Sequence, residues 1–259
     1  MDIKLWNSEI PFFKEETETP NYMKTFFLDT DEPLPCVVVI PGGGYRNRAR
    51  HEAEPIAEFF NSQGFHAVVV EYRVSPNRFP AGLSDIQRAI KILRYNAEKW
   101  NVDSNRIVVC GFSAGGHLAA STLVYSEAYK PQDGIDEMSC LPDGGILCYP
   151  VISIEDDFGH VGSGKCLLGE ERYALESGEF CLQKKVSDKT PPAFMWHTSD
   201  DNAVNVKNSL AFASALRDNG IPFEMHIFPR GKHGVGLAND YPDLGKWKFL
   251  AAEWVERNI

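Results

Sequence analysis

Residues 107–123 read IVVCGFSAGGHLAASTL, and this stretch decides the fold. It opens with Ile107-Val-Val-Cys110, a short apolar run rich in β-branched side chains, which is typical of a strand buried on both faces. It closes with helix-forming residues from His117 onward. Between the two lies Gly111-Phe-Ser-Ala-Gly115, which predicts a sharp strand-to-helix turn with Ser113 at its apex. The alternative is a glycine-rich turn that carries an incidental serine.

The same alternation of strand and helix continues outward from this turn. Short apolar runs of the strand type occupy residues 36–40, 67–70, 146–149, 193–196 and 223–228. Between and after them, apolar side chains recur at helical spacing over residues 86–93, 210–216 and 247–255. This order predicts an α/β fold with a mostly parallel sheet of about eight strands and helices on both faces. Functional residues are then expected just after the strands, at the carboxyl edge of the sheet.

Two regions depart from this alternation. In the first 35 residues, the stretches 5–13 and 22–29 predict edge strands, and the acidic side chains around them are interpreted as solvated faces. Residues 152–190 interrupt the pattern and predict a small lid-like insertion over the carboxyl edge rather than a second domain. We therefore expect a single domain over residues 1–259.

Composition excludes several classes of protein. Of the 259 residues, 43% are hydrophobic and 24% charged, which is ordinary for a globular chain. The net charge of −10 and the lack of a basic patch argue against a nucleic-acid partner. No apolar run approaches 18 residues, so no membrane helix is expected. The N-terminus lacks the apolar stretch of a secretory signal, although a signal removed earlier would leave no trace. The six cysteines contain no CxxC pair, which predicts free thiols and a location in the cytoplasm.

A serine hydroxyl at the apex of such a turn needs a base and an orienting carboxylate to act as a nucleophile. Among seven histidines, His233 follows the last predicted strand in the glycine-rich loop Arg230-Gly-Lys-His-Gly-Val-Gly236, where its side chain can reach over the sheet edge. His117, four residues after Ser113, is expected to pack or cap instead. We therefore predict that His233 is the base.

The carboxylate is expected after the strand that precedes the histidine loop. Ser199-Asp-Asp-Asn202 lies there, and the alternative role for its acids is to cap the helix expected over 206–219. Neighbouring side chains leave a strand in different directions, so both aspartates cannot reach one imidazole. Only one of the two is therefore expected to orient His233.

A hole for a substrate oxyanion completes the predicted constellation. Pro41-Gly-Gly-Gly-Tyr45 follows the strand over residues 36–40, and three glycines let backbone N–H groups approach a ligand without interference from a Cβ atom. The predicted donors are the amides of Gly43 or Gly44, together with that of Ala114. A glycine turn without function is the alternative.

With these four segments in order, the chain resembles the α/β-hydrolase serine esterases, close to the acetyl-xylan-esterase-like and hormone-sensitive-lipase-like carboxylesterases. PGGGY resembles the family's HGGG loop, GFSAGGHLA its serine turn, HTSDDNAVNV its acid loop, and GKHGVGLA its histidine loop. The match covers roughly residues 36–259. The family's acid stands four residues after His197 and three before Val204, so the resemblance implies that Asp201, and not Asp200, orients His233. Two positions depart from the pattern, Pro41 for histidine and Asn205 for proline, and neither is a reacting group.

The resemblance implies the α/β-hydrolase fold and a serine carboxylic-ester hydrolase for short acyl groups, acetyl esters and acetylated sugars above all. Fold and triad cannot separate this from an amidase, a peptidase or an arylformamidase. A hydrolase-like binding protein without catalysis is a third hypothesis. No cofactor and no metal are implied, since histidines and cysteines lack ligand spacing. The expected partner is a small-molecule ester, and the oligomeric state is left open, with a homodimer as one candidate.

Overall fold

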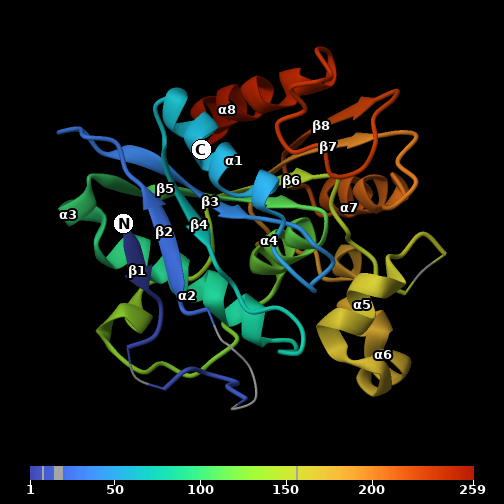
Figure 1. Cartoon of the computed structure of the whole chain (residues 1–259), viewed down its shortest axis with the longest axis horizontal. Coiled ribbons are helices and arrows are strands. Elements are labelled where there is room, and N and C mark those ends of the chain that lie inside the picture. The colour runs from blue at the N-terminus through green and yellow to red at the C-terminus, as the bar shows by residue number, and fades with distance from the viewer. Residues whose placement is uncertain (8, 15–19, 156) are drawn as a thin grey trace.

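The computed structural model describes residues 1–7, 9–14, 20–155 and 157–259. An eight-stranded sheet runs through its centre in the order β1-β2-β4-β3-β5-β6-β7-β8 (Figure 1). The two strands β1 and β2 are antiparallel to their neighbours, and the other six run parallel. The predicted mostly parallel sheet is therefore confirmed. The strands are β1 (Asp2–Lys4), β2 (Tyr22–Phe26), β3 (Leu34–Ile40), β4 (His66–Val70), β5 (Val102–Phe112), β6 (Gly144–Cys148), β7 (Ala193–Thr198) and β8 (Phe223–Phe228).

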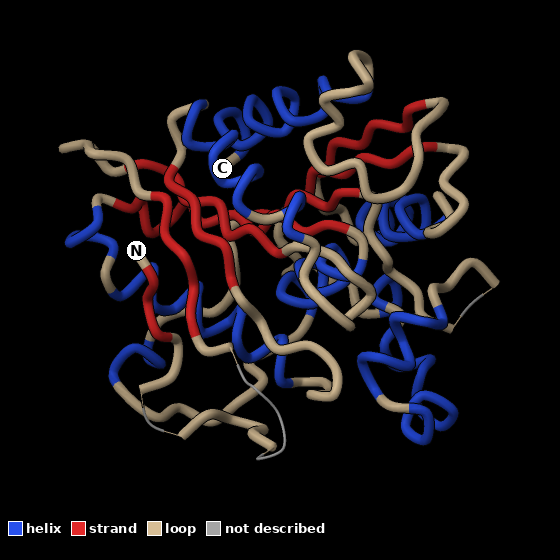
Figure 2. The backbone as a smooth tube through the Cα atoms, in the orientation of Figure 1, coloured by secondary structure: helices blue, strands red, loops and turns tan. Residues whose placement is uncertain are grey.

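Helices cover both faces of the sheet, as predicted (Figures 1 and 2). On one face lie α1 (Glu54–Ser62) and α8 (Trp247–Asn258). On the other lie α2 (Ala81–Tyr95), α4 (Ala114–Val124) and α7 (Lys207–Asp218). The shorter elements are α3 (Ala97–Trp100), α5 (Val161–Leu168), α6 (Glu170–Glu176) and the 3-10 turns η1 (Arg50–Glu52), η2 (Gly134–Glu137), η3 (Ser177–Phe180), η4 (Leu182–Lys184) and η5 (Leu244–Lys246).

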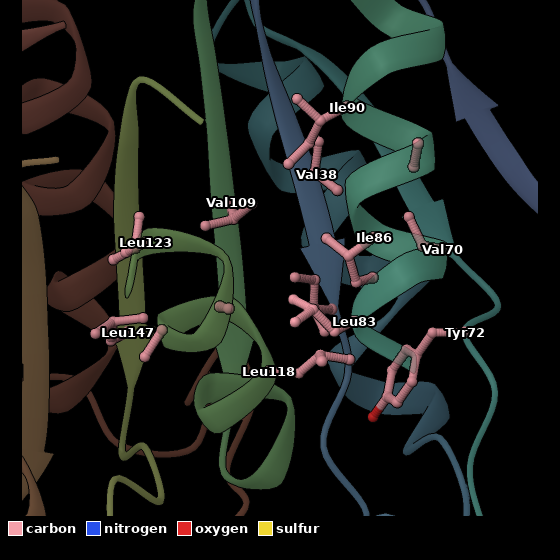
Figure 3. Close-up of a cluster of buried hydrophobic side chains, with 14 of the residues drawn as sticks. Val38, Val70, Tyr72, Leu83, Ile86, Ile90, Val109, Leu118, Leu123 and Leu147 are labelled. Atoms are coloured by element: carbon pink, nitrogen blue, oxygen red, sulfur yellow. The ribbon is translucent and has the colours of Figure 1, made fainter. Parts of the chain in front are cut away.

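Two apolar cores hold these layers together because successive side chains of a strand point to opposite faces. Along β3, Val38 points into the core under α2, α4 and α7, whereas Val37 and Val39 point into the core under α1 and α8. Figure 3 shows Ile86 and Ile90 of α2 lying over Val38. Burial of each such side chain stabilises the fold by about 1.5–3 kcal/mol, and it fixes the strand ends that carry the site.

The N-terminal prediction was partly wrong. Residues 22–26 do form a strand, β2, but it lies between β1 and β4 and not at the edge. Residues 5–13 form no strand in the part that the structure describes, and position 8 lies outside it. The chain leaves the sheet after β1 because Trp6 is buried in the core, where its indole Nε1–H donates to Asp85 Oδ1 at 2.9 Å. That tertiary contact outweighs the β propensity of this stretch.

The predicted insertion over residues 152–190 lies between β6 and β7 and contains α5 and α6. These two helices lie within residues 161–176, and the 3-10 turns η3 and η4 follow them. Helix α5 forms despite its glycines because His160 caps it, with Nδ1 accepting from the Ser163 N–H at 3.1 Å. None of the helices in the described residues has the length and apolar character that crossing a bilayer requires.

Candidate active site

Ser113 stands alone between β5 and α4 in a strained backbone conformation, with φ 53° and ψ −119°. The turn is so tight that a Cβ on Gly111 would lie 2.3 Å from the carbonyl oxygen of Gly115. A Cβ on Gly115 would lie 2.2 Å from the carbonyl oxygen of Ile40. Both positions therefore require glycine, and together they hold the hydroxyl of Ser113 at the carboxyl edge of the sheet.

The structure brings Ser113, His233 and Asp201 into one hydrogen-bonded chain. Ser113 Oγ lies 2.8 Å from His233 Nε2, across 120 residues of sequence. His233 Nδ1 lies 2.7 Å from Asp201 Oδ2. A carboxylate only accepts, so Nδ1 carries the imidazole proton and Nε2 is left to accept from the serine hydroxyl. This is the arrangement that prepares a serine for attack on a carbonyl carbon.

Asp201 is held as a buried anion. Its Oδ1 accepts from the N–H groups of Ala203 and Val204, both at 2.9 Å, and its side chain is 1% exposed. Burial by itself would raise the pKa of Asp201. Hydrogen bonds from His197, His233 and the Val204 amide outweigh it and hold the pKa well below the usual range of a carboxyl group. The side chain does not cap α7, which begins after Val206.

Asp200, in the same loop, bonds a backbone amide and not His233. Its side chain is exposed, and its Oδ1 accepts from the Gly231 N–H at 2.9 Å, two residues before His233. The adjacent acids thus point to different partners. Asp201 contacts the imidazole itself, and Asp200 contacts the backbone of the loop that carries it.

The glycine loop passes directly beside the serine, since a Cβ on Gly42 would lie 3.0 Å from Ser113 Cβ. Gly43 and Gly44 both have positive φ, 124° and 64°. A Cβ on Gly43 would lie 2.2 Å from Asn47 Oδ1. Within the described part of the chain, no acceptor is assigned to the amides of Gly43, Gly44 and Ala114. They are therefore free to donate to a ligand oxygen.

Sequence reasoning missed several residues around this constellation. His197 is fully buried, and its Nε2 lies 2.9 Å from the Val204 carbonyl oxygen and 3.4 Å from Asp201 Oδ2. The HTSDD segment quoted above contains it, so the signal was present. His51 Nε2 bonds the Gly234 carbonyl oxygen at 2.9 Å. Glu52 and Tyr149 were not singled out at all, and no local pattern marks them.

His117 packs as expected. Its Nε2–H donates to the Phe180 carbonyl at 3.1 Å, so its Nδ1 accepts from the Tyr45 hydroxyl at 2.8 Å. The side chain thereby links the glycine loop to the insertion. Burial lowers the pKa of His117 to about 4, and the ring is neutral at pH 7.

Other polar groups near the site are engaged elsewhere. Arg48 and Arg50 both pair with Glu71, and Arg46 Nε bonds Cys166 Sγ at 3.3 Å. All six cysteines are free thiols. Among the described residues, no group of three or more His, Cys, Asp or Glu side chains could hold a metal ion.

Two family models match the chain. One is described as BD-FAE and matches residues 27–138, and the other is the prolyl oligopeptidase family and matches residues 162–257. The first covers the glycine loop and the serine turn. The second covers the acid and histidine loops.

Relatives and a solved structure extend the match. Endo-1,4-beta-xylanase B of Butyrivibrio fibrisolvens is 42% identical over 83% of this chain and 34% of its own length. Acetylxylan esterase of Xylanibacter ruminicola is 32% identical over 85% of this chain and 46% of its own length. The chain thus spans a third to a half of these curated relatives.

The crystal structure of an acetyl ester-xyloside bifunctional hydrolase from Caldicellulosiruptor lactoaceticus superposes with a TM-score of 0.94. It is 46% identical, and the match covers 99% of this chain and 96% of that one. Nearly the whole of both chains is therefore shared. The chain belongs to the α/β-hydrolase serine esterases.

Proposed function

We propose that the chain hydrolyses short-chain carboxylic esters, with Ser113 as nucleophile, His233 as general base and acid, and Asp201 as the group that orients His233. Ser113 Oγ attacks the acyl carbon while its proton passes to His233 Nε2. The amides of Gly43 or Gly44 and of Ala114 bind the oxyanion that forms, and each such donor is worth about 3 kcal/mol. His233 then returns the proton to the leaving alcohol, and water releases the acyl group from the serine.

One observation carries this proposal. Ser113 Oγ lies 2.8 Å from His233 Nε2, the distance over which the serine proton is transferred, and His233 Nδ1 lies 2.7 Å from Asp201 Oδ2, in the hydrogen bond that orients the imidazole. A hydrolase-like binding protein has no need of a strained serine aligned with a histidine and a buried anion. The family membership supports the same conclusion.

The proposed substrates are acetyl esters of sugars, xylan-derived ones in particular. This rests on the relatives, of which one is named an acetylxylan esterase and another a hydrolase of acetyl esters and xylosides. The insertion is small, and few of its residues are available to wall a long apolar channel. We therefore place acetyl to butyryl esters ahead of longer ones.

An amide-cleaving activity is the second candidate, favoured by the prolyl oligopeptidase match over residues 162–257. Arg46, Arg48 and Arg50 follow the glycine loop. Arg46 alone of the three has no acidic partner among the described residues, and it is the one that could hold a substrate carboxylate. Aryl formamides and amino-acyl anilides test this candidate directly.

The experiment is a substrate panel with wild type and Ser113→Ala side by side. It contains acetyl, butyryl and octanoyl aryl esters, acetylated xylo-oligosaccharides, an aryl formamide, an amino-acyl anilide and an aryl xyloside. Acetate release from the oligosaccharides by wild type, with loss in Ser113→Ala and in fluorophosphonate-treated protein, is the expected result. Faster turnover of the formamide or the anilide than of every ester would favour the second candidate.

We extend this proposal to the domain organisation, the cofactor requirement and the location of the chain. We place the chain as a single domain with a lid-like insertion over residues 152–190, acting on a small-molecule ester without a cofactor. The six free thiols accord with a reducing compartment, and we propose the cytoplasm.

A further inference from the structure

Glu52 is a buried carboxylate directly behind the glycine loop. It ends η1 and is 2% exposed. Its Oε2 accepts from the Gly42 N–H at 2.9 Å, and its Oε1 accepts from the Tyr149 hydroxyl at 2.6 Å. Within the described residues, its one ion-pair partner is the exposed His51, at 3.7 Å. Burying a carboxyl group with no lysine or arginine beside it in the described part of the chain destabilises the fold, so a specific role is expected for Glu52.

Tyr149 carries the connection onward to the histidine loop. Its phenol oxygen donates its proton to Glu52 and accepts from the Gly236 N–H at 3.0 Å. Its ring meets the His233 ring edge to face, with centroids 4.9 Å apart. The residue follows β6 with φ 36°, a strained conformation for a non-glycine residue. In this backbone conformation the Tyr149 hydroxyl contacts Glu52 and the Tyr149 ring packs against His233.

The two oxygens of the Glu52 carboxylate thus connect to both the glycine loop and the histidine loop. Through Gly42 the carboxylate holds the loop in which Gly43 or Gly44 supplies a proposed oxyanion donor. Through Tyr149 and Gly236 it holds the loop that presents His233. A Cβ on Gly42 would lie 2.7 Å from Glu52 Oε2, so the loop rests directly on the carboxylate.

We propose that Glu52 is a positioning residue that, through Gly42 and Tyr149, sets the oxyanion amides and His233 relative to Ser113. This rests on the proposed ester hydrolysis by Ser113. Glu52 does not contact the substrate. Its effect appears in the transition state, when the oxyanion and the protonated imidazole form, and not in binding of the ground-state ester.

A carboxylate suits this position better than its amide. Two donors, an amide N–H and a phenol O–H, converge on it, and a glutamine offers only one oxygen to accept them. With its oxygen on the Gly42 N–H, its NH₂ group would face the Tyr149 hydroxyl, which then has no acceptor at position 52 for its proton. Glu52→Gln therefore keeps the volume of the side chain but breaks one of the two connections.

The test measures kcat and KM for an acetyl ester in Glu52→Gln, Tyr149→Phe and the double variant. A displacement of about 1 Å in catalytic geometry costs about 100-fold in rate. We expect kcat to fall by about 10- to 100-fold in each single variant, with KM within about twofold of wild type. Because Glu52 and Tyr149 act through the same hydrogen bond, kcat of the double variant is expected to be no lower than that of the less active single variant.

Tyr129→Phe is the matched control. It removes a similar hydrogen bond from a buried phenol to a buried carboxylate, Tyr129 to Asp136 Oδ1 at 2.6 Å, in the core on the opposite face of the sheet. Melting temperatures of all variants are measured in parallel. A comparable loss of stability with unchanged kcat in Tyr129→Phe supports a positioning role for Glu52.

Wild type and Ser113→Ala, measured alongside, distinguish a failure of the proposed ester hydrolysis from a failure of the positioning role of Glu52. If Ser113→Ala keeps wild-type activity, the proposed function fails. If Ser113→Ala is inactive and folded Glu52→Gln and Tyr149→Phe have wild-type kcat, the positioning role alone is overturned. An equal loss of kcat in Tyr129→Phe also overturns it. Should Glu52→Gln fail to fold, Tyr149→Phe decides by the same criteria.

Discussion

Replacing Asp201 by asparagine keeps the shape of the side chain and removes its charge. Asp201 Oδ1 accepts from the Ala203 and Val204 N–H groups, so an asparagine must keep its carbonyl oxygen there. Its NH₂ group then takes the place of Oδ2 and faces His233 Nδ1. A donor at that place stabilises the imidazole tautomer protonated on Nε2. That tautomer cannot accept the Ser113 proton, which is the reaction's first step.

The expected loss is large because every turnover needs the other tautomer. The corresponding change in a serine protease lowers kcat by about 10⁴, or about 5.5 kcal/mol of transition-state stabilisation. Stability should change far less, since the two backbone hydrogen bonds to Oδ1 are kept.

Asp200→Asn is the matched control. Asp200 Oδ1 accepts from the Gly231 N–H, and asparagine retains an oxygen for it. The side chain is exposed, so loss of its charge is screened by solvent. We expect kcat within about threefold of wild type, since surface substitutions of this kind change free energies by about 0.5 kcal/mol.

The assay compares kcat of both variants on an acetyl ester at saturating concentration, after matching melting curves. A larger loss in Asp200→Asn than in Asp201→Asn would refute the assignment of the orienting acid. A folded Asp201→Asn that keeps more than a tenth of wild-type kcat would refute the tautomer argument.

Four further outcomes are expected. Ser113→Ala should abolish both turnover and labelling by a fluorophosphonate, and residual labelling would point to another nucleophile. Activity should survive EDTA and mild alkylation of thiols, and reversible loss with EDTA would contradict this. kcat/KM should fall from acetyl to octanoyl esters, and a rise would disprove a short acyl site. The pKa of His117 is about 4 in the folded state, so the unfolded state, with a pKa of about 6.5, binds a proton first as pH falls. The free energy of unfolding should then drop by on the order of 3 kcal/mol between pH 6.5 and 4, and urea titrations of His117→Phe should lack this component.

The frame of the site could be predicted because its signals are local. A β-branched run, a glycine turn and an amphipathic stretch each occupy a few neighbouring residues. Chain order, together with the glycine-rich loop around His233, then favours His233 over the other histidines as the base. The alternation of side chains after a strand indicated that only one of Asp200 and Asp201 reaches His233, and the resemblance to the family's acid loop indicated which one. The structure gives each acid a different partner, His233 and the Gly231 amide.

What could not be predicted depends on contacts between distant residues. The bond from Tyr149 to Glu52 joins positions 97 residues apart, and nothing near either residue signals it. The stretch over residues 5–13 has the composition of a strand, yet the indole of Trp6 bonds Asp85 in the core and draws the chain out of the sheet. Both features depend on a buried polar contact that only the assembled fold provides, and in the stretch over residues 5–13 that contact outweighs the local β propensity.

The strained residues of the site are held by the ends of neighbouring strands. The Ser113 N–H donates to the Cys148 carbonyl of β6 at 3.0 Å, and the Ser113 carbonyl accepts from Val151 at 3.0 Å. One strand further along, the Tyr149 N–H donates to the Trp196 carbonyl of β7 at 2.8 Å. Each positive φ costs about 1–3 kcal/mol and persists only where the surroundings fix it. The hydrogen bonds of the sheet therefore continue past β5 and β6 and fix both residues, so that the rigidity of the central strands extends to the serine hydroxyl and to the ring that packs against His233.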